Sequence, residues 1–145
     1  MPEPFVYRCR VRWVDTDASG IIHFTAAFRY TEAAEIEWYR AIGAPFPHLM
    51  DDTSLTVPRV HVEADYRSAL RFDDDVAITV VPGRLGRSSL ALSFELRRDG
   101  VDGPDGPPAV RVGIVVALTD RRIAGSVPWP EAIRTRLVAA GAVPA

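Results

Sequence analysis

The chain has 145 residues, a formal net charge of −2 and 48% hydrophobic residues. This length and apolar content predict one domain, residues 1–145, with a buried core, and exclude a disordered chain. The small net charge argues against a broad surface for nucleic acid or anionic membrane, and no run approaches the roughly 20 apolar residues of a membrane span.

Missing residue types limit the chemistry further. All 17 basic residues are Arg, and the chain contains no Lys, Asn or Gln. A Schiff-base lysine and an amide side chain in an oxyanion hole are therefore excluded. The single cysteine, Cys9, excludes an internal disulfide and a cysteine-rich metal site. The start, Met1-Pro2-Glu3-Pro4, lacks the features of a signal peptide, so we expect a cytoplasmic protein.

The first predicted element is a half-buried strand over residues 5–14, because apolar and polar side chains alternate there. We expect Cys9 to be a packed thiol on its apolar face and Trp13 to lie in the core. Residues 25–42 carry apolar side chains at helical spacing, with Thr25 as N-cap and Gly43 as the stop. This helix is apolar over much of its circumference, which predicts that it is well buried.

An irregular connector, residues 44–53, follows, and its His48 is a candidate for a pocket mouth. Four alternating runs then predict strands near residues 60–66, 76–80, 89–96 and 110–118. We expect turns at Gly83–Gly86 and over the Gly/Pro-rich stretch 99–108, and a short terminal helix from Pro130 to about Ala140.

One strand, one long helix and four further strands with short connectors predict an α+β fold with an antiparallel sheet. A single helix covers only one face of such a sheet, so the other face is left to water or to another subunit. Apolar residues on several strands favour a dimer.

The two carboxylates of Asp15-Thr16-Asp17 stand between the first strand and the helix, and they allow several interpretations. They resemble the Asp-x-Asp loop of dehalogenase-type phosphatases, but the continuous parallel strand and the βα repeats of that class are absent. A metal site with His23 lacks further ligands at suitable spacing. The simplest alternative is that both Asp side chains only cap a turn.

A family resemblance shifts this balance. The stretch Asp15-Thr16-Asp17-Ala18-Ser19-Gly20-Ile21-Ile22, with the helix that follows it and Gly43, resembles the hotdog-fold acyl-CoA thioesterases. The nearest groups are the 4-hydroxybenzoyl-CoA thioesterases and the Tol–Pal-associated acyl-CoA thioesterases. Weaker matches in residues 62–67, 84–90 and 127–131 extend the resemblance over nearly the whole chain.

The resemblance implies a curved five-stranded antiparallel sheet wrapped around one long helix, with active sites at a subunit interface. It implies a homodimer or a dimer-of-dimers homotetramer, and it makes Asp17 the catalytic carboxylate and Asp15 a structural, turn-bonding residue. The backbone N–H near Phe24, at the helix start, is expected to stabilise the oxyanion. His23 is a further catalytic candidate, either orienting water or substrate or simply packing.

The predicted substrate-binding residues belong either to the stretch around Asp17 or to later segments that contain Arg and Ser. Arg residues are expected at the rim because coenzyme A carries phosphate groups. The candidates are Gly20, Ile22, Thr25, Arg67, Arg84, Arg87, Ser88 and Ser89. The chain departs from its relatives at Ala26-Ala27, where a polar residue and an aromatic one are common, and this departure predicts a larger or more apolar acyl pocket.

We therefore predict an acyl-CoA thioesterase that forms a carboxylic acid and CoA, without a cofactor or metal and without nucleic acid as partner. Asp17 acts as nucleophile or as general base. The alternatives are a thioesterase for an acyl carrier protein, a non-catalytic acyl-CoA-binding hotdog protein, or a hotdog dehydratase, for which the His-centred motif is missing.

Overall fold

The computed structural model describes residues 2–44 and 54–145, so His48 and most of the predicted connector lie outside the described residues. The main sheet has the strand order β1-β4-β5-β6-β3, and all pairs along this path are antiparallel. Its strands are β1 (Phe5–Arg10), β3 (Arg59–Tyr66), β4 (Asp75–Leu85), β5 (Ser89–Arg98) and β6 (Val110–Ala117). The predicted five-stranded antiparallel sheet is confirmed.

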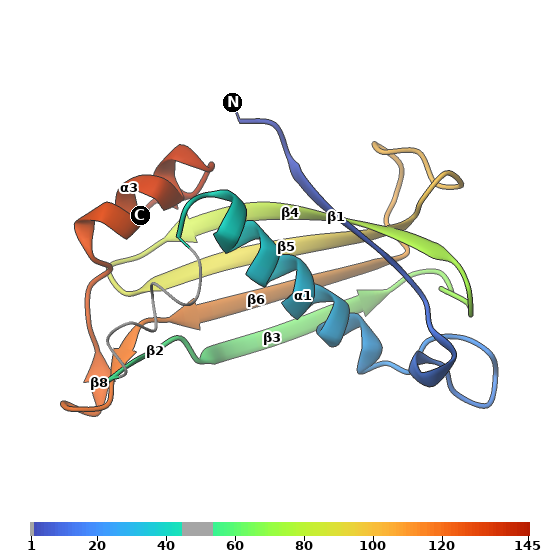
Figure 1. Ribbon diagram of the computed structural model, residues 1–145, viewed down its shortest axis with the longest axis horizontal. Coiled ribbons are helices and arrows are strands. Elements are labelled where there is room, and N and C mark those ends of the chain that lie inside the picture. Colours follow the sequence, from blue (N-terminus) through green and yellow to red (C-terminus); the bar gives the residue numbers. More distant parts are fainter. Residues whose placement is uncertain (1, 45–53) are drawn as a thin grey trace.

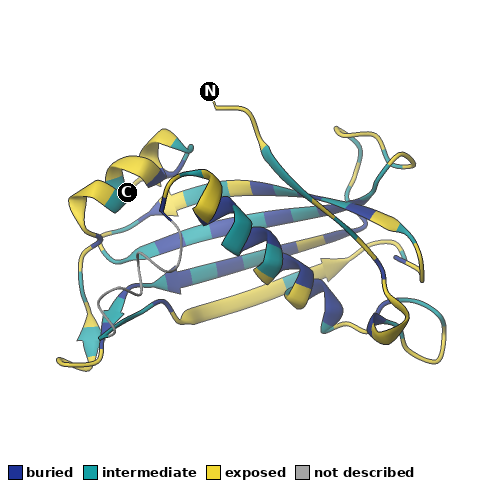
Figure 2. Ribbon diagram, in the orientation of Figure 1, coloured by how far each residue is buried: buried dark blue, intermediate teal, exposed yellow. Residues whose placement is uncertain are grey.

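The long helix α1 (Ala26–Ala41) crosses one face of this sheet and packs on β1, β4 and β6 (Figure 1). Its sheet-facing stripe is buried, including Ala34 and Trp38. The facing strands alternate strictly: Leu90, Leu92, Phe94 and Leu96 of β5 are at most 1% exposed. This alternation appears as bands along β5 and β6 in Figure 2. The core therefore forms between α1 and one sheet face, as the period-two pattern requires.

Smaller elements complete the fold at one end of the sheet. Strands β2 (Leu55–Thr56), β7 (Thr119–Asp120) and β8 (Gly125–Ser126) form a second, three-stranded sheet. The terminal helix α3 (Glu131–Ala139) is followed by β9 (Val143–Pro144), which pairs in parallel with β4. Helix α3 was predicted at this position, whereas β9 and the small sheet were not, because two-residue strands leave no periodicity in the sequence.

Three local predictions are wrong. β1 ends at Arg10, and Trp13–Asp15 form a short 3-10 helix instead of continuing the strand. Trp13 is consequently 73% exposed and packs edge-on against Phe72, with ring centroids 5.3 Å apart. The predicted turn at Gly83–Gly86 starts later, because β4 passes through a register irregularity and continues to Leu85.

Strand β3 differs from the other long strands in that almost all of its residues are exposed (Figure 2). It is a sheet edge that pairs only with β6 within the described residues. Its helix-side residues Val62 and Tyr66 are 51% and 46% exposed. An uncovered apolar edge is a surface that proteins normally cover.

Phe94 provides a direct test of the core. Its side chain is fully buried in the middle of β5, so Phe94→Ala is expected to lower the free energy of unfolding by about 3–5 kcal/mol through the cavity it leaves. Chemical denaturation measures this loss. Ser93→Ala, next to it but on the other sheet face, is the control and is expected to change stability by less than about 1 kcal/mol. Equal effects of the two variants would contradict the assignment of faces.

Candidate active site

A tight loop between the 3-10 helix and α1 contains the predicted catalytic residues. The Asp17 N–H donates to the Ile21 carbonyl at 2.9 Å, and the Gly20 N–H donates to the Asp17 carbonyl at 3.0 Å. Gly20 has a φ of +80°, a conformation that favours glycine. Ile21 also bridges to Arg71, in the segment that follows β3. The loop is therefore held by backbone hydrogen bonds on both sides.

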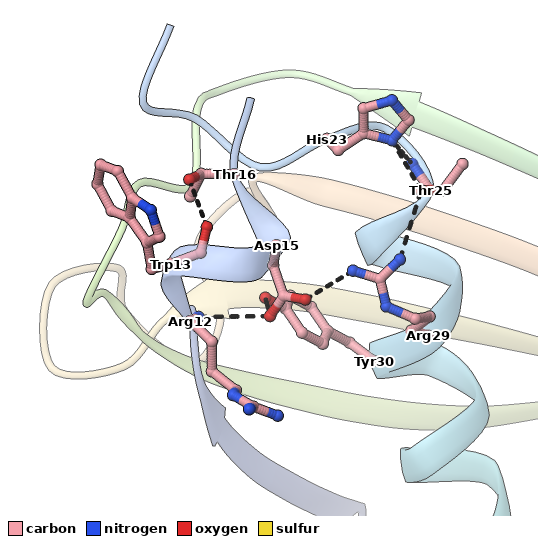
Figure 3. A network of polar contacts seen from close by, with 8 residues as sticks. All are labelled: Arg12, Trp13, Asp15, Thr16, His23, Thr25, Arg29 and Tyr30. Carbon is pink, nitrogen blue, oxygen red and sulfur yellow. Dashed lines mark hydrogen bonds and ion pairs between the residues drawn. The ribbon is translucent and has the colours of Figure 1, made fainter. Parts of the chain in front are cut away.

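Asp15 anchors this loop to α1 (Figure 3). Its side chain is buried, one oxygen accepts Arg29 Nη2 at 2.6 Å, and the other accepts Tyr30 Oη at 2.6 Å and the Arg12 N–H at 3.3 Å. The His23 N–H donates to the Asp15 carbonyl at 2.7 Å. The prediction that Asp15 bonds turn N–H groups thus holds only for Arg12, because its main partners are two side chains of the helix.

The ionisation of Asp15 reflects these contacts. Burial by itself would raise the pKa of Asp15, but the hydrogen bonds from Tyr30 and Arg29 outweigh it and hold the pKa below 3.8. Asp15 is therefore a buried carboxylate that stays charged at neutral pH because its partners stabilise the charge.

Asp17 lies in a different environment, with its carboxylate exposed to solvent. One oxygen accepts the Ser19 N–H at 2.8 Å and also the Ser19 hydroxyl. These hydrogen bonds lower the pKa of Asp17 below 3.8. Ser19 was not among the predicted site residues, although its spacing two residues after an Asp is the signal of an Asx-type turn.

The backbone at the start of α1 presents a free donor. Within residues 2–44 and 54–145, no acceptor pairs with the Phe24 N–H. The Phe24 carbonyl accepts Tyr66 Oη at 2.5 Å, which joins the end of β3 to this position. Tyr66 is a second site residue that the sequence analysis missed, and only the fold brings it to the loop. The Phe24 ring itself is 62% exposed.

His23 and Thr25 interact with each other. His23 Nδ1 lies 2.7 Å from the Thr25 hydroxyl and also accepts the Thr25 N–H at 3.3 Å. Thr25 occupies the predicted N-cap position, but its side chain makes no capping hydrogen bond. The hydrogen bonds of His23 go to Thr25 and not to Asp17, so a catalytic role of His23 stays a prediction.

The predicted substrate-binding residues separate into two places. Gly20, Ile22 and Thr25 belong to the Asp17 loop, and Arg67 directly follows β3 at the same end of the sheet. Ile22 is only 7% exposed and packs into the core, so its side chain supports the loop instead of facing a ligand.

The second group lies at the opposite end of the sheet. The Phe72 N–H, just before β4, donates to the Gly20 carbonyl, whereas Arg84 lies near the end of β4 and Arg87, Ser88 and Ser89 follow it. Strand β4 has 11 residues and spans about 35 Å. One chain therefore does not bring these four residues to Asp17.

Other chemistries find no support in the described part of the chain. No group of three or more His, Cys, Asp or Glu side chains there could hold a metal ion. Burial raises the pKa of Cys9 to about 11, so its thiol is protonated and unsuited as a nucleophile. No helix among the described residues has the length and apolarity to cross a membrane.

Comparison with protein families gives this geometry its context. The sequence model of the thioesterase-like superfamily matches residues 11–137, a range that contains the Asp17 loop, α1 and the whole sheet from β3 to β6. The chain belongs to the thioesterase-like superfamily. The predicted class of protein, a hotdog-fold acyl-CoA thioesterase, is thereby confirmed, while the roles of individual residues are not tested by this match.

Individual relatives agree with this family. A protein of Aquifex aeolicus, provisionally named an esterase, is 33% identical over 98 residues, which cover 68% of this chain and 76% of the relative. A 1,4-dihydroxy-2-naphthoyl-CoA hydrolase of Prochlorococcus marinus is 32% identical over 97 residues, covering 62% and 65%. The crystal structure of a 1,4-dihydroxy-2-naphthoyl-CoA thioesterase from Synechocystis superposes with a TM-score of 0.83 at 15% identity, covering 94% and 96%, and shows the shared fold.

In this thioesterase-like protein, Asp15→Ala tests the anchor of the loop. At pH 7 the variant is expected to lose about 2 kcal/mol of unfolding free energy, because it leaves Tyr30 and Arg29 without their acceptor. A carboxylate whose pKa is lowered on folding stabilises the protein above its unfolded-state pKa, and this contribution is lost as the pH falls. The difference between wild type and variant should therefore shrink below about pH 4.

Denaturation at several pH values measures both effects. Asp105→Ala, an exposed carboxylate in the hairpin loop after β5, is the control and should leave stability nearly unchanged. A stability difference for Asp15→Ala that does not vary between pH 7 and pH 3 would argue against a charged Asp15.

Proposed function

We propose that this protein hydrolyses an acyl-CoA thioester to a carboxylic acid and CoA, with Asp17 as the catalytic carboxylate and the Phe24 N–H as the oxyanion donor. The unpaired Phe24 N–H, at the start of α1 and on the loop that carries Asp17, is the observation that carries this proposal, because it is free to donate to a partner. An acyl oxygen supplies that partner. One such donor typically contributes roughly 3 kcal/mol to transition-state stabilisation.

The reaction follows from the groups on the loop. In the nucleophilic form, an Asp17 oxygen attacks the thioester carbon, the C–S bond breaks, and CoA leaves as thiolate. Water then hydrolyses the mixed anhydride and restores the carboxylate. In the general-base form, Asp17 takes a proton from water, which attacks the same carbon directly. The lowered pKa keeps Asp17 ionised, as both forms require.

An aromatic acyl group is the substrate class that we propose. Relatives with about one third identical residues carry the name 1,4-dihydroxy-2-naphthoyl-CoA hydrolase. The small residues Ala26 and Ala27 at the start of α1 add no support for this class, because both are fully buried in the core. CoA as the carrier, in place of an acyl carrier protein, and a cytoplasmic location remain predictions.

We further propose that two copies of the chain pair through the free edge of β3. This strand is exposed over nearly all of its residues and forms an edge of the sheet, and a two-fold axis across that edge runs the two β3 strands antiparallel. The Tyr66 end of one subunit then lies beside the Arg59 end of the other. In this arrangement, Arg87 of the second subunit approaches the Asp17 loop of the first, which unites the two groups of predicted residues. A homotetramer built from two such dimers stays a prediction.

Asp17→Asn tests the catalytic assignment. The amide neither attacks the thioester nor accepts a proton at neutral pH, so hydrolysis of an aromatic acyl-CoA should fall by at least about a hundredfold. Thiol release followed with a chromogenic disulfide measures the rate. Because Asp17 is exposed, the unfolding midpoint and the affinity for CoA are expected to stay close to wild type.

Asp73→Asn, in the exposed turn before β4, is the matched control and should keep wild-type turnover. Wild-type turnover in Asp17→Asn would overturn the role of this carboxylate.

A mixed-dimer experiment tests the shared site. Arg87→Ala should raise KM for an acyl-CoA much more than for the corresponding acyl-pantetheine, because the shorter substrate lacks the nucleotide phosphates. When Asp17→Asn and Arg87→Ala chains are co-expressed, each mixed dimer contains one intact site. The mixture should therefore hydrolyse acyl-CoA at low concentration faster than either variant alone. No recovery, or a monomer by light scattering, would contradict the shared site.

A further inference from the structure

A small groove lies between α1 and the uncovered strand β3. Its apolar walls are Phe28 of α1, Val62 of β3 and Ile114 of β6. Its volume is about 280 Å³, which is at the lower end for small-molecule sites and suits an acyl group better than a complete acyl-CoA. Phe28 lies about one helical turn beyond the Phe24 position, so the groove begins about one turn along the helix from the Phe24 N–H.

A cluster of charged side chains closes the far part of this groove. Glu32 and Glu35 follow Phe28 on the same face of α1, at helical spacings of four and seven residues. Arg59, at the start of β3, faces them. Glu35 is fully buried, and its two oxygens accept Arg59 Nη2 at 2.5 Å and Tyr39 Oη at 3.0 Å.

The buried Glu35 fixes the position of Arg59. Burial raises the pKa of Glu35, and the Arg59 guanidinium counteracts this by its charge and its hydrogen bond. An unpaired carboxylate at this depth would be costly, so the ion pair ties the Arg59 side chain to the helix. Arg59 is a ligand-recognition candidate for the same reason, because its guanidinium is held in one place before any ligand arrives.

Arg59 has hydrogen-bond donors at the groove that no described residue uses. Arg59 uses only Nη2 in its contacts with described residues, which leaves the donors on Nε and Nη1 available. Its Nη2 is also 3.7 Å from an oxygen of Glu32, whose side chain is 59% exposed. The three side chains carry a combined formal charge of −1. This balance disfavours an anionic ligand group and suits a neutral group that both accepts and donates.

We infer that Arg59, positioned by Glu35, is a specificity-determining residue that selects acyl groups with a hydroxyl at the end remote from the thioester. The hydroxyl oxygen accepts a hydrogen bond from Arg59, and the hydroxyl proton is donated to Glu32. Phe28, Val62 and Ile114 pack against the ring between this hydroxyl and the thioester. This inference rests on the proposed thioesterase function and adds the polar feature that the acyl group must carry.

The test compares three CoA esters that differ at one position: 4-hydroxybenzoyl-CoA, benzoyl-CoA and 4-carboxybenzoyl-CoA. Wild-type kcat/KM should be about tenfold or more higher for the hydroxylated ester than for benzoyl-CoA, because the latter leaves Arg59 and Glu32 unsatisfied. The carboxylated ester should be the poorest substrate. The hydroxyl-to-unsubstituted ratio is the readout, since a general loss of stability or activity does not change it.

Three variants address the cluster. Arg59→Lys keeps the charge opposite Glu35 but lacks the planar fork of donors, so the ratio should fall several-fold. Glu32→Gln, at an exposed position, should also lower it. The pair Glu35→Leu/Arg59→Met removes both buried charges together, avoids leaving one of them unpaired, and should bring the ratio close to one. The control Glu37→Gln/Arg40→Met removes the exposed ion pair on the same helix and should keep the wild-type ratio.

The outcomes separate the two proposals. An unchanged ratio in folded Arg59→Lys, or a wild-type enzyme that prefers benzoyl-CoA or the carboxylated ester, would overturn the role of Arg59 while leaving the thioesterase intact. If the wild type hydrolyses none of the esters, the proposed function fails. In that case calorimetry measures the affinities of 4-hydroxybenzoyl-CoA and benzoyl-CoA for wild type and Arg59→Lys. A ratio of these affinities that is the same in both proteins would overturn the role of Arg59.

Discussion

The hydrogen bonds of one buried carboxylate determine where the candidate site forms. Asp15 binds Arg29 and Tyr30, in the first turns of α1, and its own backbone carbonyl holds His23. This anchor adds side-chain hydrogen bonds to the backbone ones that join the loop to the helix, such as the bond from the Ala26 N–H to the His23 carbonyl. The position of the Phe24 N–H relative to the sheet therefore depends on the Asp15–Arg29 ion pair together with the hydrogen bond from Tyr66 Oη to the Phe24 carbonyl.

The second constraint is that a single helix is too narrow for the sheet. α1 packs on β1, β4 and β6, whereas almost every residue of β3 is exposed. Because one helix does not cover the whole sheet, β3 keeps a free edge that suits a partner subunit. The same arrangement leaves the groove between α1 and β3 that ends at Arg59. The groove and the proposed subunit contact thus follow from one packing arrangement. Both involve β3, whose Tyr66 also bonds to the Phe24 carbonyl beside the Asp17 loop.

Periodicity predicted the long elements well, because burial of one face dictates the alternation in β5 and β6 and the helical spacing in α1. It failed at Trp13, where a 3-10 turn rotates an apolar residue into solvent while the alternation continues in the sequence. The Asp17 loop was found through its motif. Tyr66 and Arg59 could not be found in this way, because their relation to the loop and to Glu35 exists only once β3 lies beside α1.

The hydrogen bonds from Ser19 bear on how Asp17 works. A general base is most effective when its pKa is near the working pH, and a carboxylate with a pKa below 3.8 holds a proton from water poorly. The same weak basicity makes the carboxylate a better leaving group from an anhydride. In the proposed covalent route, the Ser19 hydrogen bonds therefore act in opposite directions: they weaken Asp17 as a nucleophile and ease its departure from the anhydride.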